Sequence, residues 1–178
     1  VPHWSKSPDA RYATFNARSE DAHTKPAFRS AFRRGRCLIP VSGFYEWQKL
    51  STPGTQPQKA PHYITRADNQ PLLFAGLCDT WGDPTIGPPL ESCTILTTTP
   101  NAEMRSVHDR MPCILEPENA EHWLDPDQTT DKCRALLRPA PDGLLTMHKV
   151  GSAVGRVTNN APSLIEPADR GDQGAEDH

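Results

Sequence analysis

A glutamate stands in the aromatic run of residues 44–47, where its carboxyl group could do acid–base chemistry. Apolar surroundings raise the pKa of a carboxyl group toward the range useful for a general acid or base. If the run is a strand, Glu46 shares a face with Phe44 and lies opposite Tyr45 and Trp47. The alternative, a surface glutamate between core aromatics, fits this segment equally well.

A histidine and a polar pair could supply further chemistry. His108 is followed directly by Asp109 and Arg110, in a segment that we expect to be a loop before a strand. Catalytic groups often lie in such loops, and histidine exchanges a proton near neutral pH. Asn16 and Arg18, two residues apart on an extended segment, could present an amide and a bidentate guanidinium to a phosphate or carboxylate. A solvated histidine, a turn asparagine and a salt-bridged arginine are the structural alternatives.

The distribution of charged and aromatic residues is compatible with a nucleic-acid partner. Residues 1–49 carry nine lysines and arginines against four acidic residues, whereas the whole chain has a net charge of −3. A basic region fits an anionic partner such as nucleic acid, although a solvated helix face gives the same pattern. Trp4, Phe44 and Trp47 could stack on unpaired bases, with packing in the core as the alternative.

Several classes of protein are not supported. The five cysteines form no Cys-x-x-Cys pair and have no histidine at zinc-ligand spacing, so we expect neither a metal site nor a bound cofactor. Their places inside apolar runs suggest reduced, buried thiols, and we expect a cytoplasmic protein. The apolar runs are far shorter than the roughly 18 residues of a membrane-spanning helix. The Gly-x-Ser-x-Gly elbow of serine hydrolases is absent.

The elements that must position these groups are short. Proline positions and apolar spacing predict helices over residues 25–34, 117–124 and 131–137. Strands are expected over residues 37–41, 43–48, 62–66, 72–77, 92–99, 111–115 and 144–150, with the third and fourth forming a hairpin around residues 68–70. Short strands joined by such loops imply an α+β fold with an antiparallel sheet or open barrel.

Five segments, taken in their order, resemble the SRAP family, the SOS-response-associated peptidases that crosslink to abasic sites in single-stranded DNA. Each segment is short, but their joint order is specific, and the resemblance extends to about residue 167. They are residues 1–4 (Val-Pro-His-Trp), 16–20 (Asn-Ala-Arg-Ser-Glu), 36–47 (from Arg-Cys-Leu-Ile-Pro to Phe-Tyr-Glu-Trp), 106–112 (Ser-Val-His-Asp-Arg-Met-Pro) and 154–159 (Val-Gly-Arg-Val-Thr-Asn).

The resemblance implies a single domain over residues 1–167, built on an antiparallel, barrel-like sheet with a few short helices. Residues 168–178 are expected to be an acidic disordered tail. The resemblance also implies a cysteine that becomes the mature N-terminus by removal of a leading residue. Its amine and thiol capture the aldehyde of the ring-opened abasic sugar as a thiazolidine, as part of the response to DNA damage.

The same resemblance implies roles for seven residues of this sequence. Glu46 would serve proton transfers, His108 would act on the sugar oxygen, and Asn16 would orient the amine and the sugar. Arg18 and Arg110 correspond to positions that hold flanking phosphates. In the same groove the resemblance places two more DNA-binding residues, Trp4 and Thr97.

The sequence begins at Val1, without the Cys-Gly-Arg start that the resemblance implies. We expect that start to precede Val1 in the natural protein, and we expect a chain that begins at Val1 not to crosslink DNA. Two other functions stay open. One is a thiol peptidase acting on peptides through the same N-terminal cysteine. The other is a noncovalent single-stranded DNA-binding module that uses basic residues 29–36 and the aromatic side chains.

Overall fold

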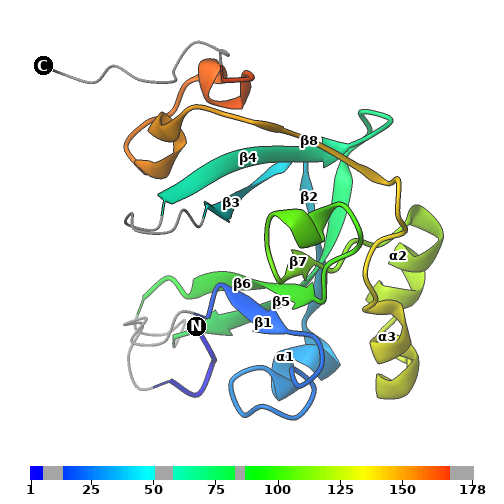
Figure 1. Cartoon of the computed structure of the whole chain (residues 1–178). Coiled ribbons are helices and arrows are strands. Elements are labelled where there is room, and N and C mark those ends of the chain that lie inside the picture. Colours follow the sequence, from blue (N-terminus) through cyan, green and yellow to red (C-terminus); the bar gives the residue numbers. More distant parts are fainter. Residues whose placement is uncertain (6–13, 51–57, 83–86, 169–178) are drawn as a thin grey trace, which may run out of the picture.

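The structure, a computed structural model, describes residues 1–5, 14–50, 58–82 and 87–168 (Figure 1). In chain order its elements are β1 (Asn16–Arg18), α1 (Arg29–Arg34), β2 (Arg36–Val41), β3 (Phe44–Leu50), β4 (Gln58–Arg66), β5 (Leu72–Trp81), β6 (Leu90–Thr98), the 3₁₀ helix η1 (Met104–Ser106), β7 (Met111–Pro112), α2 (Pro117–Leu124), α3 (Thr130–Leu136), β8 (Leu145–Lys149), and the 3₁₀ helices η2 (Ser152–Gly155) and η3 (Pro162–Ile165).

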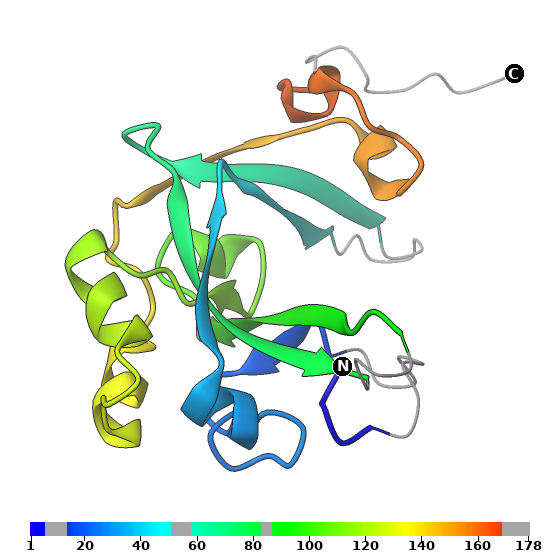
Figure 2. The ribbon, with the colours of Figure 1, turned by 180° about the vertical axis from the view of Figure 1, so that it is seen from behind.

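The strands form two sheets. Sheet A has the order β1-β6-β5-β2, with β7 beside β6, and sheet B has the order β3-β4-β8. β1 runs parallel to β6, while the other pairings of these strands are antiparallel. Sheet B lies above sheet A in Figures 1 and 2, with α1 below sheet A and with α2 and α3 at one side. The α+β class is therefore confirmed, with two facing sheets in place of a closed barrel.

Sheet A has an apolar core on each face. One core joins the sheet to the helices, where Phe32 of α1 meets Trp123 of α2 edge to face at 5.7 Å between ring centroids. The indole N–H of Trp123 also donates to the carbonyl of Cys37 in β2, at 2.9 Å. The other core lies between the sheets and contains Ile64 of β4 and Phe74 of β5. Burial of these large side chains fixes the relative positions of the two sheets.

The predicted helices are present with small differences in their bounds. α2 has the predicted bounds, because Pro117 at its first turn and the apolar spacing mark both ends. α3 begins and ends one residue earlier than predicted, with the Thr129 side chain accepting from the N–H of Lys132 as a cap. α1 begins at Arg29, four residues later than predicted, because the chain from Lys25 to Phe28 forms a turn instead.

The hairpin predicted around residues 68–70 is wrong. β4 pairs with β3 and β8, whereas β5 pairs with β2 and β6, so the turn carries the chain from sheet B to sheet A. Arg66 holds this turn by bonding Asp68 and, through two bonds of 3.0 Å, the carboxylate of Glu116 before α2. Contacts distant in sequence therefore decide which sheet each strand joins.

Three expectations concern termini, membranes and metals. Of the predicted acidic tail, only Ala168 lies within the described residues. In the described part of the chain no helix is both long enough and apolar enough to cross a membrane. Within the same residues, no three histidine, cysteine or acidic side chains are grouped so that they could hold a metal ion.

Candidate active site

A pocket of about 370 Å³ lies between the two sheets. Its apolar wall comes from Phe44 of sheet B and from Phe74 and Ile95 of sheet A. The pocket is also lined by six of the seven residues to which the sequence assigns a role: Asn16, Arg18, Glu46, Thr97, His108 and Arg110. The fold thus brings together groups that are separated by up to 94 residues in the sequence.

β1 supplies the asparagine and an arginine. Ala17 between them is buried, and Asn16 and Arg18 are exposed on the other side of the strand, as the spacing predicts. The parallel pairing with β6 sets Arg18 beside Thr97, whose hydroxyl donates to the carbonyl of Ala17 at 3.3 Å. These side chains form the rim of the pocket at the β1–β6 edge.

β3 supplies the glutamate. The Glu46 side chain is only 25% exposed, and two residues before it Phe44 packs edge to face on Phe74 at 5.5 Å. Burial raises the pKa of the Glu46 carboxyl group above its usual value, while the nearby His108 acts in the opposite direction. The direction of this shift is the one that the sequence predicts for Glu46.

The loop after η1 supplies the histidine. Nδ1 of His108 lies 3.1 Å from both the backbone N–H and the carbonyl oxygen of Arg110, so it accepts from the N–H in one tautomer and donates to the carbonyl in the other. The same Nδ1 is 3.9 Å from a carboxylate oxygen of Glu46. Gln48, on the same face of β3 as Glu46, donates its amide N–H to the carbonyl of Ser106 at 2.9 Å. This bond, which the sequence analysis missed, ties the histidine loop to the strand that carries the glutamate.

Arg110 is less available than its assigned role requires. Its Nη1 and Nη2 bind the two carboxylate oxygens of Glu20 at 2.6 and 2.8 Å, and Nη2 also donates to the carbonyl of Thr97 at 2.5 Å. This hydrogen bonding lowers the pKa of Glu20. A phosphate that binds Arg110 end-on must displace Glu20. Glu20 belongs to the 16–20 motif, but nothing in the sequence indicates its partner 90 residues away.

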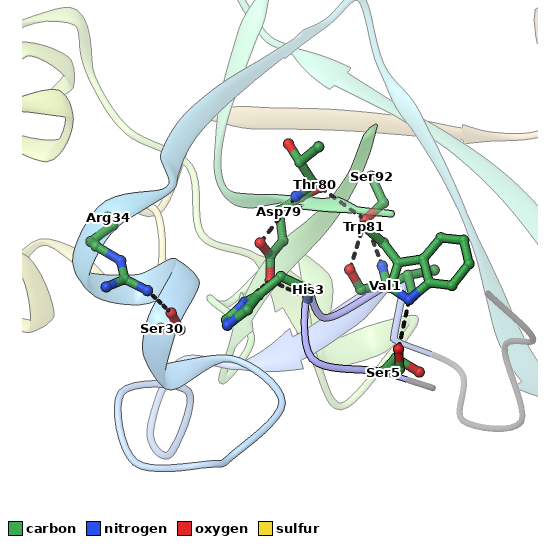
Figure 3. Close-up of polar contacts among 9 residues, drawn as sticks. All are labelled: Val1, His3, Ser5, Ser30, Arg34, Asp79, Thr80, Trp81 and Ser92. Carbon is green, nitrogen blue, oxygen red and sulfur yellow. Dashed lines mark hydrogen bonds and ion pairs between the residues drawn. The ribbon is translucent and has the colours of Figure 1, made fainter. Parts of the chain in front are cut away.

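Trp4 is not brought to the pocket. It is 57% exposed and lines a separate surface depression of about 410 Å³ with Arg29 and Arg33 of α1. The segment around it is held against sheet A: Ser5 accepts a bond from the indole N–H of Trp81 at 2.7 Å, and the Val1 amine donates to the Ser92 hydroxyl (Figure 3). The predicted groove is therefore two separate surfaces, the pocket and a basic depression beside α1.

The pocket can transfer protons to and from a bound substrate. It offers a carboxyl group with a raised pKa, an imidazole and an amide, and Arg18 at the rim can attract an anion. Among the described residues that line it there is neither a cysteine nor a lysine. The arrangement thus supplies acid–base groups, and a thiol or amine nucleophile has to come from another part of the protein or from the substrate.

Residues 1–157 match the family described as SOS response associated peptidase (SRAP). The abasic site processing protein YoqW of Bacillus subtilis is 41% identical over 167 residues, covering 93% of this chain and 72% of YoqW. The abasic site processing protein HMCES of Xenopus tropicalis is 32% identical over 188 residues, covering 93% of this chain and 54% of HMCES.

A solved structure shows the same fold. The crystal structure of a protein from Bacteroides thetaiotaomicron superposes with a TM-score of 0.82 at 28% identity, covering 94% of this chain and 73% of that one. The sequence match and the shared fold both extend over nearly the whole chain. The chain belongs to the SOS response associated peptidase family.

Proposed function

We propose that this chain carries the acid–base groups of a protein that processes abasic sites in DNA by covalent capture. The observation that carries the proposal is the convergence of Asn16, Glu46 and His108 on one pocket. The names of the relatives, which are abasic site processing proteins, support the substrate class. The proposed substrate is an abasic site in single-stranded DNA.

The chemistry follows from the structure of the lesion. An abasic sugar interconverts between a closed ring and an open-chain aldehyde. Ring opening places a proton on the ring oxygen, and the imidazole of His108, which lines the pocket, is the donor assigned to this step. The adjacent Glu46, with its raised pKa, can return a proton in the reverse direction or accept one from the incoming amine.

Capture of the aldehyde then takes two bonds. The α-amine of an N-terminal cysteine, on a segment ahead of Val1, adds to the aldehyde carbon, and the adduct loses water to give an imine. The thiol of the same cysteine adds to the imine carbon and passes its proton to the nitrogen, which closes a thiazolidine ring. Glu46 in its protonated form donates to the departing hydroxyl group, and Asn16 orients the amine. The sum is one aldehyde, one amine and one thiol joined with loss of one water.

Binding of the flanking DNA is assigned to Arg18. Its side chain is exposed at the pocket rim, whereas the guanidinium of Arg110 is held by Glu20. Arg18→Ala should weaken binding to single-stranded DNA about 5- to 150-fold, which corresponds to roughly 1–3 kcal/mol for charge-assisted bonds, and by the same factor for different base sequences. Fluorescence anisotropy with an oligonucleotide carrying a stable abasic analogue measures this change without any covalent step.

Two variants serve as controls. Arg134→Ala removes an exposed arginine on α3 that pairs with Asp131, and its affinity for DNA should equal that of the parent chain. Glu46→Gln should keep the noncovalent affinity, because the proposal assigns it to proton transfer. Equal losses for Arg18→Ala and Arg134→Ala would refute the assignment of Arg18, since the effect would then come from net charge alone.

A noncovalent single-stranded DNA-binding module is the second candidate, and the depression formed by Trp4, Arg29 and Arg33 favours it. An exposed tryptophan beside two arginines can stack on a base while the arginines hold phosphates. Strongly salt-dependent binding with no preference for an abasic oligonucleotide would support this candidate over lesion processing. Cleavage of unrelated peptides that is lost in Glu46→Gln would support a thiol peptidase.

A further inference from the structure

Three of the five cysteines lie on one face of sheet A. Cys78 in β5 stands directly opposite Cys93 in β6. Cys37 in β2 stands opposite Gly76, two residues before Cys78. Because side chains alternate along a strand, residues 76 and 78 share a face, and Cys37 is therefore diagonal to Cys78.

The thiol face is the one opposite the N-terminal segment. Asp79 and Ser92, the register pair next to the two cysteines, bind residues 1–5 through His3 and the Val1 amine (Figure 3). Alternation then turns Cys78 and Cys93 to the other face, where both are exposed, so the burial expected for the cysteines from the sequence is wrong for these two. On β6 the same face continues to Ile95, which lines the pocket.

The backbone hydrogen bonds define the type of this pair. In an antiparallel strand the N–H and C=O of one residue point to the same side. The N–H of Cys78 donates to Gly35, which precedes β2, at 2.6 Å, and so points away from β6. The N–H of Ile95 donates to Phe15 at 2.8 Å, so Ile95 and, two residues earlier, Cys93 point away from β5.

Cys78 and Cys93 are therefore a non-hydrogen-bonded pair. Residues in such pairs have Cα atoms about 4.5 Å apart and the closer side chains of the two pair types. Disulfide-linked cysteines have Cα separations of about 4.4–6.8 Å. The two cysteines are thus within bridging distance without movement of either strand.

Cys37 differs from the other two thiols. It is half-buried, and its Sγ lies over Gly76, where an added Cβ would come within 2.9 Å of that sulfur. Burial raises the pKa of Cys37 to about 12, and the neighbouring Cys78, whose side chain is in hydrogen-bond contact with Cys37, adds to the effect. Cys37 therefore stays a protonated thiol at neutral pH and is a poor nucleophile.

We propose that Cys78 and Cys93 form an oxidation site that closes to a cross-strand disulfide when the protein meets a peroxide. One of the two thiolates attacks the peroxide oxygen and becomes a sulfenic acid, and the peroxide leaves as hydroxide or alkoxide. The second thiolate attacks the sulfenic sulfur and releases hydroxide, which takes up a proton as water. In total two thiols lose two electrons and two protons, and the peroxide is reduced.

The proposal is tested by intact mass and peptide mapping of the reduced 178-residue chain after treatment with hydrogen peroxide. The expected product is lighter by about 2 Da, for the two hydrogens lost, and returns to the starting mass with dithiothreitol. Cys78 and Cys93 share the tryptic peptide 67–105, so a bridge between them leaves trypsin products unlinked. Cleavage after Glu91 then yields two peptides that stay joined until reduction.

Matched variants separate this pair from the other thiols. Cys78→Ser and Cys93→Ser, made on different strands, should each abolish the mass loss, whereas Cys37→Ser and Cys133→Ser should keep it. Unfolding the chain in urea before oxidation should replace the single bridge with mixed pairings. A tryptic product that joins Cys37 to Cys78, or irreversible oxidation of one cysteine without a bridge, would overturn the proposal.

Discussion

Glu20 and Arg110 are expected to depend on each other for their contribution to stability. Arg110 is 18% exposed and Glu20 is 51% exposed, and both carboxylate oxygens are bound by the guanidinium. The substitutions Glu20→Ala and Arg110→Ala, made singly and together, measure this dependence. The two side chains join the turn after β1 to the loop that holds His108, and Arg110 itself lines the pocket.

The magnitude lies between the limits for surface and buried ion pairs. Exposed pairs contribute about 0.2–1 kcal/mol, and breaking a buried pair costs about 3–5 kcal/mol. When Arg110 is removed, the half-exposed Glu20 regains contact with water, so the cost is smaller than that of breaking a buried pair. The bidentate bonding makes the contribution larger than that of an ordinary surface pair. We expect Glu20→Ala to cost about 1–2 kcal/mol and a coupling free energy of similar size. Arg110→Ala should cost about 2–3 kcal/mol, because the bond to the carbonyl of Thr97 is also lost.

Urea-induced unfolding of the parent, the two single variants and the double variant gives the coupling free energy. The nearby pair Lys25 and Asp21 is the matched control, with a similar N–O distance of 2.8 Å but side chains 50% and 39% exposed. Its coupling should be no more than about 0.5 kcal/mol. Strictly additive costs for Glu20 and Arg110, or a coupling no larger than that of the control pair, would show that the two side chains do not stabilise the fold as an ion pair.

The contribution of the Glu20–Arg110 pair to stability should also depend on pH. The pKa of Glu20 is lowered in the folded protein, so its contribution is present above the unfolded pKa, close to 4.5, and is lost as the pH falls through the folded value. The difference in stability between the parent and Glu20→Ala should therefore shrink on acidification. A difference that stays constant down to the acid limit would contradict the ion pair as its source.

Two further predictions concern stability. Glu46→Gln should raise the free energy of unfolding at neutral pH, because burial raises the folded pKa of Glu46 and its charged form costs stability above that pKa. In a pH series of urea titrations this gain should disappear as the pH falls toward the usual value of 4.5, and a loss of stability at neutral pH would contradict it. Gly35→Ala should cost about 2 kcal/mol or more in thermal unfolding, because the added Cβ collides with the backbone carbonyl of Cys78. Gly155→Ala, where nothing lies within 4 Å, is the control, and equal effects would show that the collision is relieved.

Local patterns in the sequence predicted the helices and strands more reliably than they predicted which strands pair with one another. Pro117 and the apolar spacing after it were sufficient to place α2, because both signals lie within the helix. The turn between β4 and β5 has the sequence of a hairpin, but the pairing of each strand depends on β3, β8, β2 and β6, which no local pattern records. The parallel pairing of β1 with β6 joins segments about 80 residues apart, and no local pattern in the sequence predicted it either.

In the candidate site, too, local features could be predicted from the sequence, whereas contacts between distant segments could not. Alternation placed Asn16 and Arg18 on one side of a strand, and the aromatic run indicated the environment of Glu46. The commitment of Arg110 to Glu20 could not be predicted, because arginines that bind phosphate and arginines that bind carboxylate have the same local sequence signals. Period-two spacing could have indicated Gln48 beside Glu46, but its acceptor, the carbonyl of Ser106, is a feature of the folded loop.

Covalent capture of an abasic site can be detected by intact mass after incubation with single-stranded DNA carrying one such site. Two proteins are compared: this 178-residue chain, and the protein at its natural length with its N-terminal residue established by its own mass. A protein that begins with cysteine should give an adduct of protein plus oligonucleotide less one water, formed more slowly in Glu46→Gln, and the chain from Val1 should give none. An adduct on the chain from Val1, or its absence from a protein shown to begin with cysteine, would rule out capture by an N-terminal cysteine.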